Sequence, residues 1–326
     1  MKTNRLQTKG SIANYLCWFL TILLVGIVIA YLTHTDCKNK FTLINQDFAC
    51  GEKPVIDKRG YAAIQKQIED YVSSQKNTGE VSEVAVYFRD LVGGPVFGIN
   101  EFTDFAPASL LKLPFVLTYL KESEELGPDM LKQSLLYLPE TKEFEQNFVP
   151  EETLKPGESY TVEDLLRRML SYSDNSSSNL LAAHLESTGK KNIIGETMLE
   201  LGILAPDDPF DKVVSVRRYG SIFRGLYNVS LLNSENSNKV LEWLSQSKFK
   251  TGLVAGVPSS IKVAHKFGER LLEDNTRQLH DCGIIYYPDN PYLLCIMTHG
   301  NVYESLEKTI GTISKMVYDE VDSRRQ

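Results

Sequence analysis

Residues 105–120 read FAPASLLKLPFVLTYL, and this stretch decides how the rest of the chain is interpreted. Apolar side chains from Leu110 to Leu120 predict a buried helix whose N-terminal end lies at Ser109. Unpaired backbone N–H groups and the positive end of the helix dipole favour negative charge at such an end. Lys112 follows one helical turn later and lies on the same face. The stretch therefore predicts a serine nucleophile with a lysine beside it.

A lysine in this place can act as a base if it is buried. Removal from water disfavours the charged ammonium form, so a neutral amine becomes available to accept the proton of the serine hydroxyl. The Ser-x-x-Lys pattern alone is not specific, because it also begins at Ser73, Ser187, Ser245, Ser247, Ser259 and Ser305. The copy at Ser109 opens the long apolar run, and Pro114 lies close enough to the start of that run to cost little. The flanking sequence therefore selects Ser109 and Lys112.

A second motif, Ser173-Asp174-Asn175, occurs once in the chain. It follows a predicted helix whose start is marked by a capping-box pattern at Thr161 and Asp164. In such a site the serine can relay a proton to a leaving nitrogen, and the asparagine amide can bond both a lysine and a substrate carbonyl. The alternative interpretation is a polar loop that only caps the next helix.

The third motif is Lys266-Phe267-Gly268, and a competing copy, Lys250-Thr251-Gly252, lies earlier in the chain. Residues 261–265 alternate between two faces as a half-buried strand does, and a hairpin is expected over 282–298. The earlier copy leads into a stretch typical of a turn. The context therefore selects the later copy, and His265 is expected to be a packing residue on the opposite side of the strand from Lys266.

Together the three motifs resemble those of the penicillin-recognising serine hydrolases, and among them the class A β-lactamase type. The similarity covers about residues 61–326 and includes the Phe-Ala-Pro-Ala sequence ahead of Ser109, residues 157–175, the stretch 251–258 and the strand pair after Lys266. The resemblance implies an α/β (α+β) fold. It would contain a five-stranded antiparallel sheet flanked by helices and an all-helical subdomain, with the active site in the cleft between them.

The resemblance also implies a role for each motif residue. Ser109 would be the acylated nucleophile, Lys112 its base and Ser173 the proton relay. The substrate-binding residues that it implies are Asn175, Lys266, Gly268 and Glu269. The backbone N–H groups of Ser109 and Glu269 would stabilise the anionic intermediate, and Lys266 would face a substrate carboxylate. No cofactor is implied.

Two features depart from the class A pattern. Phe267 stands where the family usually has a small hydroxyl residue that helps to bind the substrate carboxylate. Between Ser187 and Tyr219 there is no convincing counterpart of the Glu-x-x-x-Asn pattern, whose glutamate activates the deacylating water. The acids available there are Glu196, Glu200, Asp207, Asp208 and Asp211. We therefore expect efficient acylation and a deacylation step without its usual base.

These observations predict a serine hydrolase that opens β-lactams through an acyl-enzyme. One alternative is a D-alanyl-D-alanine carboxypeptidase or transpeptidase that acts on peptidoglycan stem peptides, and another is a non-catalytic penicillin-binding sensor. A net charge of −7 without a basic stripe argues against nucleic acid as a partner. The five histidines show no metal-ligand spacing, which argues against a zinc hydrolase.

Residues 11–32 form a stretch of 22 residues without a charge, long enough to span a hydrocarbon core of about 30 Å. Lys2, Arg5 and Lys9 precede it, which favours a cytoplasmic N-terminus. We therefore expect a single-pass protein of the bacterial cell membrane, in contact with membrane lipid and with its catalytic domain outside. A cleaved signal peptide is the alternative, but no small-x-small cleavage site follows.

The chain is predicted to divide into a cytoplasmic tail (1–10), a transmembrane helix (11–32), a linker (33–60) and one catalytic domain (61–326). Within that domain, Ile64, Ile68 and Val72 predict a first helix. A strand pair is expected over 83–90 and 95–100. The chain closes on a helix with one apolar face, formed by Leu306, Ile310, Ile313 and Val317.

Four cysteines lie on the predicted outer side of the membrane, where disulfides are permitted. Cys37 with Cys50 would close a short loop in the linker. Cys282 and Cys295 lie nearly opposite each other in the predicted hairpin. These last two can form a disulfide or remain small buried apolar side chains, and the sequence leaves both outcomes open.

Overall fold

The computed structural model describes residues 14–28, 40–46, 60–138, 147–150, 152–190, 192–200 and 213–324. Three of the predictions fall outside these residues. They concern the cytoplasmic tail at 1–10, the pairing of Cys37 with Cys50, and the loop acids Asp207, Asp208 and Asp211.

The centre of the fold is a five-stranded sheet in which every neighbouring pair of strands is antiparallel. Its strands, in spatial order, are β2 (Val96–Ile99), β1 (Val81–Asp90), β7 (Tyr292–Gly300), β6 (Arg277–Ile285) and β5 (Val263–Leu271). The predicted strand pair and the predicted hairpin are both confirmed. β5 carries the third motif and forms an edge of the sheet, so one side of its backbone pairs with no other strand in the described part of the chain.

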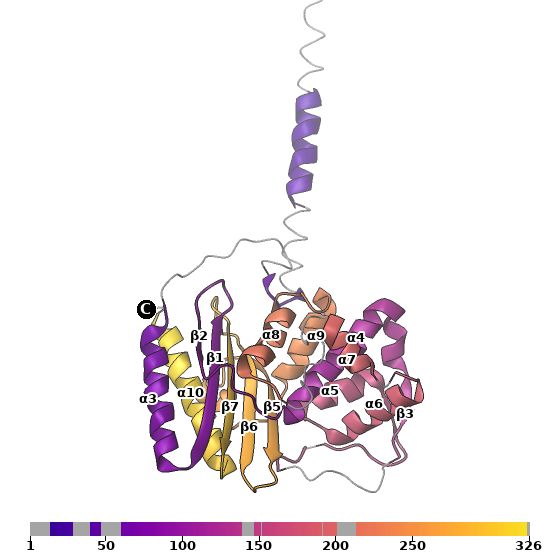
Figure 1. The fold of residues 1–326 in the computed structure, drawn as a ribbon. Coiled ribbons are helices and arrows are strands. Elements are labelled where there is room, and N and C mark those ends of the chain that lie inside the picture. The colour runs from indigo at the N-terminus through magenta and orange to yellow at the C-terminus, as the bar shows by residue number, and fades with distance from the viewer. Residues whose placement is uncertain are drawn as a thin grey trace, which may run out of the picture.

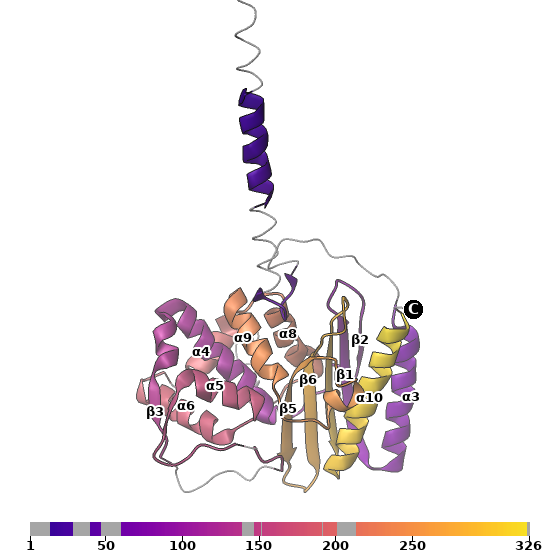
Figure 2. The same ribbon diagram turned by 180° about the vertical axis from the view of Figure 1, so that it is seen from behind.

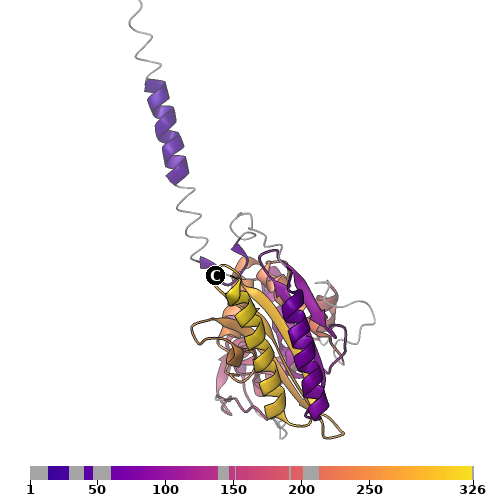
Figure 3. The same cartoon turned by 90° about the vertical axis from the view of Figure 1, so that its left-hand side faces the viewer.

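Two helices, α3 (Ala62–Thr78) and α10 (Tyr303–Ser323), lie side by side over one face of the sheet (Figure 3). Both bury the apolar residues that predicted them, namely Ile64, Ile68, Val72, Leu306, Ile310, Ile313 and Val317. These residues pack with the sheet in a common hydrophobic core. The first and the last helix of the predicted domain are therefore confirmed.

The opposite face of the sheet and the space beside it are occupied by six further helices (Figures 1 and 2). They are α4 (Lys112–Leu126), α5 (Val162–Ser171), α6 (Asn175–Ser187), α7 (Ile193–Glu200), α8 (Val216–Tyr227) and α9 (Ser234–Ser245). Shorter elements here are the 3₁₀ turns η1 (Ala108–Leu111) and η2 (Pro128–Lys132) and the strands β3 (Ser134–Leu136) and β4 (Ser159–Thr161). A second hydrophobic core joins these helices to the sheet. The α/β architecture with a helical part agrees with the fold that the resemblance implied.

Residues 14–28 are helical and are the described part of the charge-free stretch 11–32. Across the described residues, no helix reaches the length and hydropathy that crossing a membrane requires.

Part of the predicted linker at 33–60 packs on the body of the fold. Leu43 and Ile44 are almost completely buried among the helices. The backbone N–H of Leu43 donates to Asn238 Oδ1 at 3.2 Å, and its carbonyl accepts the hydroxyl proton of Tyr286 at 2.7 Å. Removal of these apolar side chains from water stabilises the docked segment.

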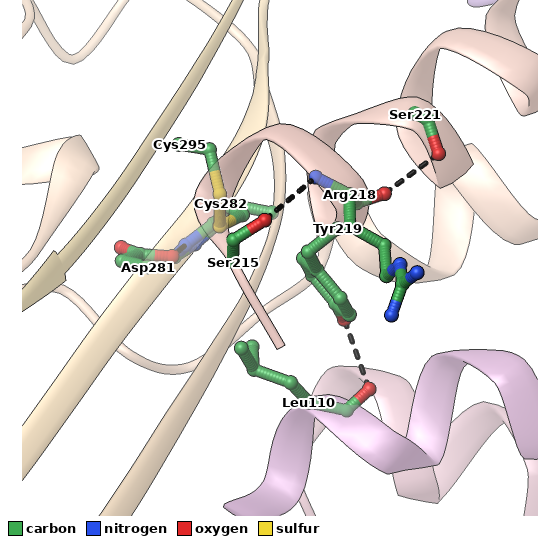
Figure 4. Close-up of a disulfide and its surroundings, with 9 residues drawn as sticks. Leu110, Ser215, Arg218, Tyr219, Ser221, Asp281, Cys282 and Cys295 are labelled. Carbon is green, nitrogen blue, oxygen red and sulfur yellow. Dashed lines mark hydrogen bonds and ion pairs between the residues drawn. A yellow bond between two sulfur atoms is a disulfide. The ribbon is translucent and has the colours of Figure 1, made fainter. Parts of the chain in front are cut away.

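Cys282 on β6 and Cys295 on β7 form a disulfide (Figure 4). The two residues face each other directly in the register of the strands, and their Cα atoms are 3.9 Å apart. Both are fully buried. The structure thus decides between the two alternatives for this pair. Buried cysteines were expected under both interpretations, so the pattern of buried residues alone could not distinguish a disulfide from two free thiols.

Candidate active site

Three segments that are far apart in the sequence meet between the helical part and the edge strand of the sheet. Ser109 lies in η1, just before α4 begins at Lys112. Ser173 lies in the turn between α5 and α6, and Lys266 lies on β5. Side-chain contacts within hydrogen-bond distance connect all three segments. The structure therefore brings the three predicted motifs together.

The amine of Lys112 is at the centre of these contacts. Its Nζ lies 3.2 Å from Ser109 Oγ, 3.2 Å from Ser173 Oγ and 2.7 Å from Asn175 Oδ1. It also donates to the backbone carbonyl of Ser173. Because Lys112 is only 7% exposed, these protein groups replace most of the water that would surround a lysine at the surface. The amine is thus fixed in position beside the hydroxyl of Ser109.

Burial lowers the pKa of Lys112 to about 7, although the carboxylates of Asp174 and Glu269 act in the opposite direction. The charged ammonium form is disfavoured because the protein interior solvates it less well than water does. A large fraction of the amine is therefore neutral at neutral pH. A neutral amine at hydrogen-bond distance from a serine hydroxyl can accept its proton.

Lys266 is completely buried and continues the polar chain beyond Ser173. Its Nζ lies 2.9 Å from Ser173 Oγ and donates to the Phe267 carbonyl at 2.7 Å. Burial, and after it the positive charge of Lys112, hold the pKa of Lys266 well below the usual range for lysine. Ser173 Oγ therefore lies between two amines, an arrangement that suits proton transfer.

The turn that presents Ser173 is built by local hydrogen bonds. Ser173 has a φ of 56°, in the left-handed region that few non-glycine residues adopt. The next residue, Asp174, caps α6, because its carboxylate accepts the backbone N–H groups of Ser176 and Ser177, each at 3.1 Å. Both interpretations of the second motif therefore apply. Asp174 caps α6, and the turn directs the side chain of Ser173 toward Lys112.

Gly268 lies against the segment that carries Ser109. A Cβ atom at this position would lie 3.1 Å from the carbonyl oxygen of Pro107 and 3.1 Å from the backbone nitrogen of Leu110. Both distances are shorter than ordinary van der Waals contact. Because a Cβ here would push the segment away by a few tenths of an ångström, glycine allows β5 to approach it this closely.

The side chain of Glu269 makes a contact that the sequence did not indicate. Its Oε1 accepts the backbone N–H of Phe148 at 2.9 Å, whereas Oε2 is buried without a hydrogen-bond partner among the residues described. Burial raises the pKa of this carboxyl group, and the backbone N–H groups of Phe148 and Asn147 oppose the rise. The chain around Phe148 therefore packs on the same edge strand that carries Lys266.

Phe267, the departure from the family motif, belongs to an aromatic cluster. Its ring stacks on Phe249 with centroids 4.3 Å apart and meets Phe148 edge to face at 5.7 Å. Phe148 also meets Tyr303 edge to face at 5.9 Å. Sequence reasoning missed this cluster because its four members lie in separate parts of the chain and no short-range pattern connects them.

His265 is buried, as expected, but its predicted role as a packing residue alone is wrong. Its Nδ1 lies 2.8 Å from Oδ1 of Asp281 on β6. The other carboxylate oxygen of Asp281 accepts the backbone N–H of Leu253 at 2.8 Å, where the 3₁₀ turn η3 (Leu253–Gly256) begins. The polar pair therefore ties this turn to the sheet, on the face of β5 opposite to Lys266.

Two of the loop acids considered from the sequence, Glu196 and Glu200, lie in α7. The side chain of Glu200 is 61% exposed, and its Oε1 lies 3.7 Å from Nζ of Lys121 on α4. In the described ranges, no hydrogen bond or ion pair joins either acid to the hydroxyl of Ser109 or the amine of Lys112.

A family model described as the β-lactamase enzyme family matches residues 63–321. A comparison with curated proteins gives no match.

Solved structures with the same fold include a protein called PBP-A, which is 21% identical and superimposes with a TM-score of 0.65 over 82% of this chain and 98% of that one. The TLA-1 extended-spectrum β-lactamase is 17% identical, with a TM-score of 0.67 over 81% of this chain and 99% of its own. A class A β-lactamase from Mycobacterium abscessus is 20% identical, with a TM-score of 0.63 over 78% and 99%. At such identities these structures show a shared fold.

Proposed function

The chain belongs to the β-lactamase enzyme family and is a serine hydrolase of the class A type, and from this premise we propose that it hydrolyses β-lactams through an acyl-enzyme. The observation that carries the proposal is the buried amine of Lys112, which has a pKa of about 7 and lies 3.2 Å from the hydroxyl of Ser109. Attack of a serine on an amide carbonyl at neutral pH needs such a base.

In the proposed acylation step, Oγ of Ser109 attacks the lactam carbonyl carbon while the amine of Lys112 accepts the hydroxyl proton. The C–N bond of the lactam then breaks, and the departing nitrogen receives a proton from the hydroxyl of Ser173, which regains one from Lys112. Separations of 3.2 Å from Lys112 Nζ to both hydroxyl oxygens support this path. The backbone N–H groups of Ser109 and Glu269 would stabilise the anionic tetrahedral intermediate.

We assign substrate binding to the polar groups around this centre. Asn175 orients Lys112 through its Oδ1, and its amide nitrogen would donate to a substrate carbonyl. Lys266 would face the substrate carboxylate. Because Phe267 packs in the aromatic cluster and has no hydroxyl, that carboxylate would lose one hydrogen bond that the family usually provides. Gly268 would let the bound substrate and β5 lie close to Ser109.

A second candidate function is that of a D-alanyl-D-alanine carboxypeptidase or transpeptidase acting on peptidoglycan stem peptides. It is supported by the sequence between Ser187 and Tyr219, which has no convincing counterpart of the Glu-x-x-x-Asn pattern that supplies the deacylating base in class A enzymes. Without a base for the deacylating water, an acyl-enzyme formed with a β-lactam persists. The two functions therefore differ in the second half of the reaction.

Turnover of a chromogenic cephalosporin by the full-length chain distinguishes the two functions. Hydrolysis of β-lactams predicts steady product release over many equivalents per protein molecule. A burst of about one equivalent followed by arrest would contradict it and point to the second candidate. Release of D-alanine from a peptide ending in D-alanyl-D-alanine would then support that candidate, and no release would remove it.

We further propose that residues 11–32 anchor the protein in a bacterial cell membrane, with the catalytic domain outside. The proposal is supported by the lack of charge in this stretch and by its described helix, in which Trp18 is 71% and Phe19 64% exposed. Exposed apolar side chains along a helix need an apolar environment. In cell fractionation, the protein should stay with the membranes after a carbonate wash, and a variant that begins at residue 33 should not. Release of the full-length chain by the wash would contradict the anchor.

A further inference from the structure

The residue that precedes Ser109 has an unusual backbone conformation. Ala108 has a φ of 49°, in the left-handed region. A residue with a Cβ atom stays in this region only where the surrounding structure imposes it. The direction in which Ser109 presents its Oγ and its backbone N–H depends on this torsion angle, because the two residues share a peptide bond.

Two side chains from β6 hold the segment that leads into Ala108. The backbone N–H of Ala106 donates to Gln278 Oε1 at 3.0 Å, and the carbonyl of Ala106 lies 3.1 Å from His280 Nε2. Residues 278 and 280 point to the same face of β6 because side chains alternate along a strand. Both polar groups of a single peptide residue are therefore fixed by neighbouring side chains of one strand.

The protonation state of His280 fits this contact. Burial lowers the pKa of His280 to about 4, so its ring is neutral at neutral pH. A carbonyl oxygen can only accept a hydrogen bond, and the ring must therefore carry its proton on Nε2. The ring also meets Phe105 edge to face, with centroids 5.3 Å apart. His280 thus contacts two successive residues of the segment.

The ends of the segment are anchored by other contacts. Phe105 exchanges two backbone hydrogen bonds with Val214, at 3.0 and 2.8 Å. At the other end, the hydroxyl of Tyr219 donates to the carbonyl of Leu110 at 3.0 Å (Figure 4). The two hydrogen bonds to Ala106 lie between these anchors. Directly beside them, the backbone N–H of Leu110 donates to the carbonyl of Pro107 at 3.0 Å, which closes the turn around Ala108.

We propose that Gln278 and His280 are positioning residues that hold Ala106 and thereby impose the left-handed conformation of Ala108 that aims Ser109 at Lys112. The inference rests on the proposed function, because it takes Ser109 as the acylated residue. Neither side chain has to touch a substrate. Their action passes through the backbone of the segment 106–108.

The experiment measures the rate constant of acylation by penicillin and the dissociation constant of the preceding complex. His280→Leu keeps the volume and removes the donor, and Gln278→Met keeps the length and removes the acceptor. Each should slow acylation by about tenfold to a hundredfold, because small displacements of a reacting atom have effects of this size, while the dissociation constant stays within about twofold. The conservative variant His280→Gln, which keeps a donor, should recover most of the rate. His299→Leu is the matched control and should acylate as the unchanged protein does, since its ring bonds to Thr276.

A second measurement separates positioning from a general structural role. Ala108→Gly removes the steric cost of the left-handed conformation, so His280→Leu should slow acylation by less than about threefold in that background. An equal loss in both backgrounds, or no loss in either single variant, would overturn the inference. If His280→Leu does not fold, the inference is tested by the other two variants: Gln278→Met should lose acylation rate and His280→Gln should keep most of it. Absence of labelling in the unchanged protein would instead count against the proposed function.

Discussion

Replacement of Ser109 by alanine should abolish covalent modification by penicillin. The nucleophilic oxygen is removed, and in enzymes of this mechanism such a change slows the chemical step by about 10⁴-fold or more. Ser109 is only partly buried and its hydroxyl contacts Lys112, so the free energy of unfolding should change by less than about 1 kcal/mol. Intact-protein mass spectrometry after a brief and a long exposure to penicillin reports the amount and the lifetime of the adduct, and peptide mapping identifies the modified residue.

The matched control for this change is Ser73→Ala. Ser73 also precedes a lysine by three residues, but it lies on the exposed side of α3 and its hydroxyl donates to the carbonyl of Glu69. This variant should be labelled as fully as the unchanged protein. Stoichiometric labelling of Ser109→Ala would mean that another residue is the nucleophile, and the proposed mechanism would be wrong.

Replacement of Lys112 by arginine should slow acylation by about 10³-fold, within the range usual for loss of a general base. A guanidinium group stays charged at every relevant pH and cannot accept the proton of Ser109. The control is Lys121→Arg on the same helix. The amine of Lys121 lies 3.8 Å from the carboxylate of Glu125, so arginine at this position should leave the acylation rate unchanged. An acylation rate of Lys112→Arg close to that of the unchanged protein would exclude Lys112 as the base.

The pH dependence of acylation gives an independent check on Lys112. Burial lowers its pKa to about 7, and the neutral amine is the active form. The rate should therefore rise with pH, pass its half-maximum near pH 7 and level off above it, whereas Lys112→Arg should lack this rise. A rate that falls with increasing pH through 7 would mean that the charged amine is required, and the assignment of the base would fail.

Local features of the fold could be predicted because they depend on neighbouring residues. The spacing of Ile64, Ile68 and Val72 places them on one face of α3, and the hydroxyl of Thr161 accepts the backbone N–H of Asp164 at the start of α5. The three-residue spacing of Ser109 and Lys112 likewise brings their side chains together within one turn. In each case the periodicity of the backbone determines the contact.

Contacts between distant segments could not be predicted in this way. The hydrogen bond from Phe148 to Glu269 joins an irregular segment to an edge strand. The disulfide of Cys282 with Cys295 required the register of two strands, and a pattern of buried residues does not specify whether two facing cysteines are joined. His265 was assigned to packing because the sequence does not show that the carboxylate of Asp281, on the neighbouring strand, lies within hydrogen-bond distance of it.

The sequence alone determined the order of the three motifs and the choice of Ser109 among several Ser-x-x-Lys copies. It also determined that the first motif lies at the start of a helix, the second after a helix and the third on a strand. Only the tertiary structure decided that Lys112 is buried enough to lose much of its charge near neutral pH and that Lys266 is buried completely. The physical reason is that desolvation depends on every atom packed around an amine. Those atoms come from η1, the turn before α6 and β5, which are neighbours only in the folded chain.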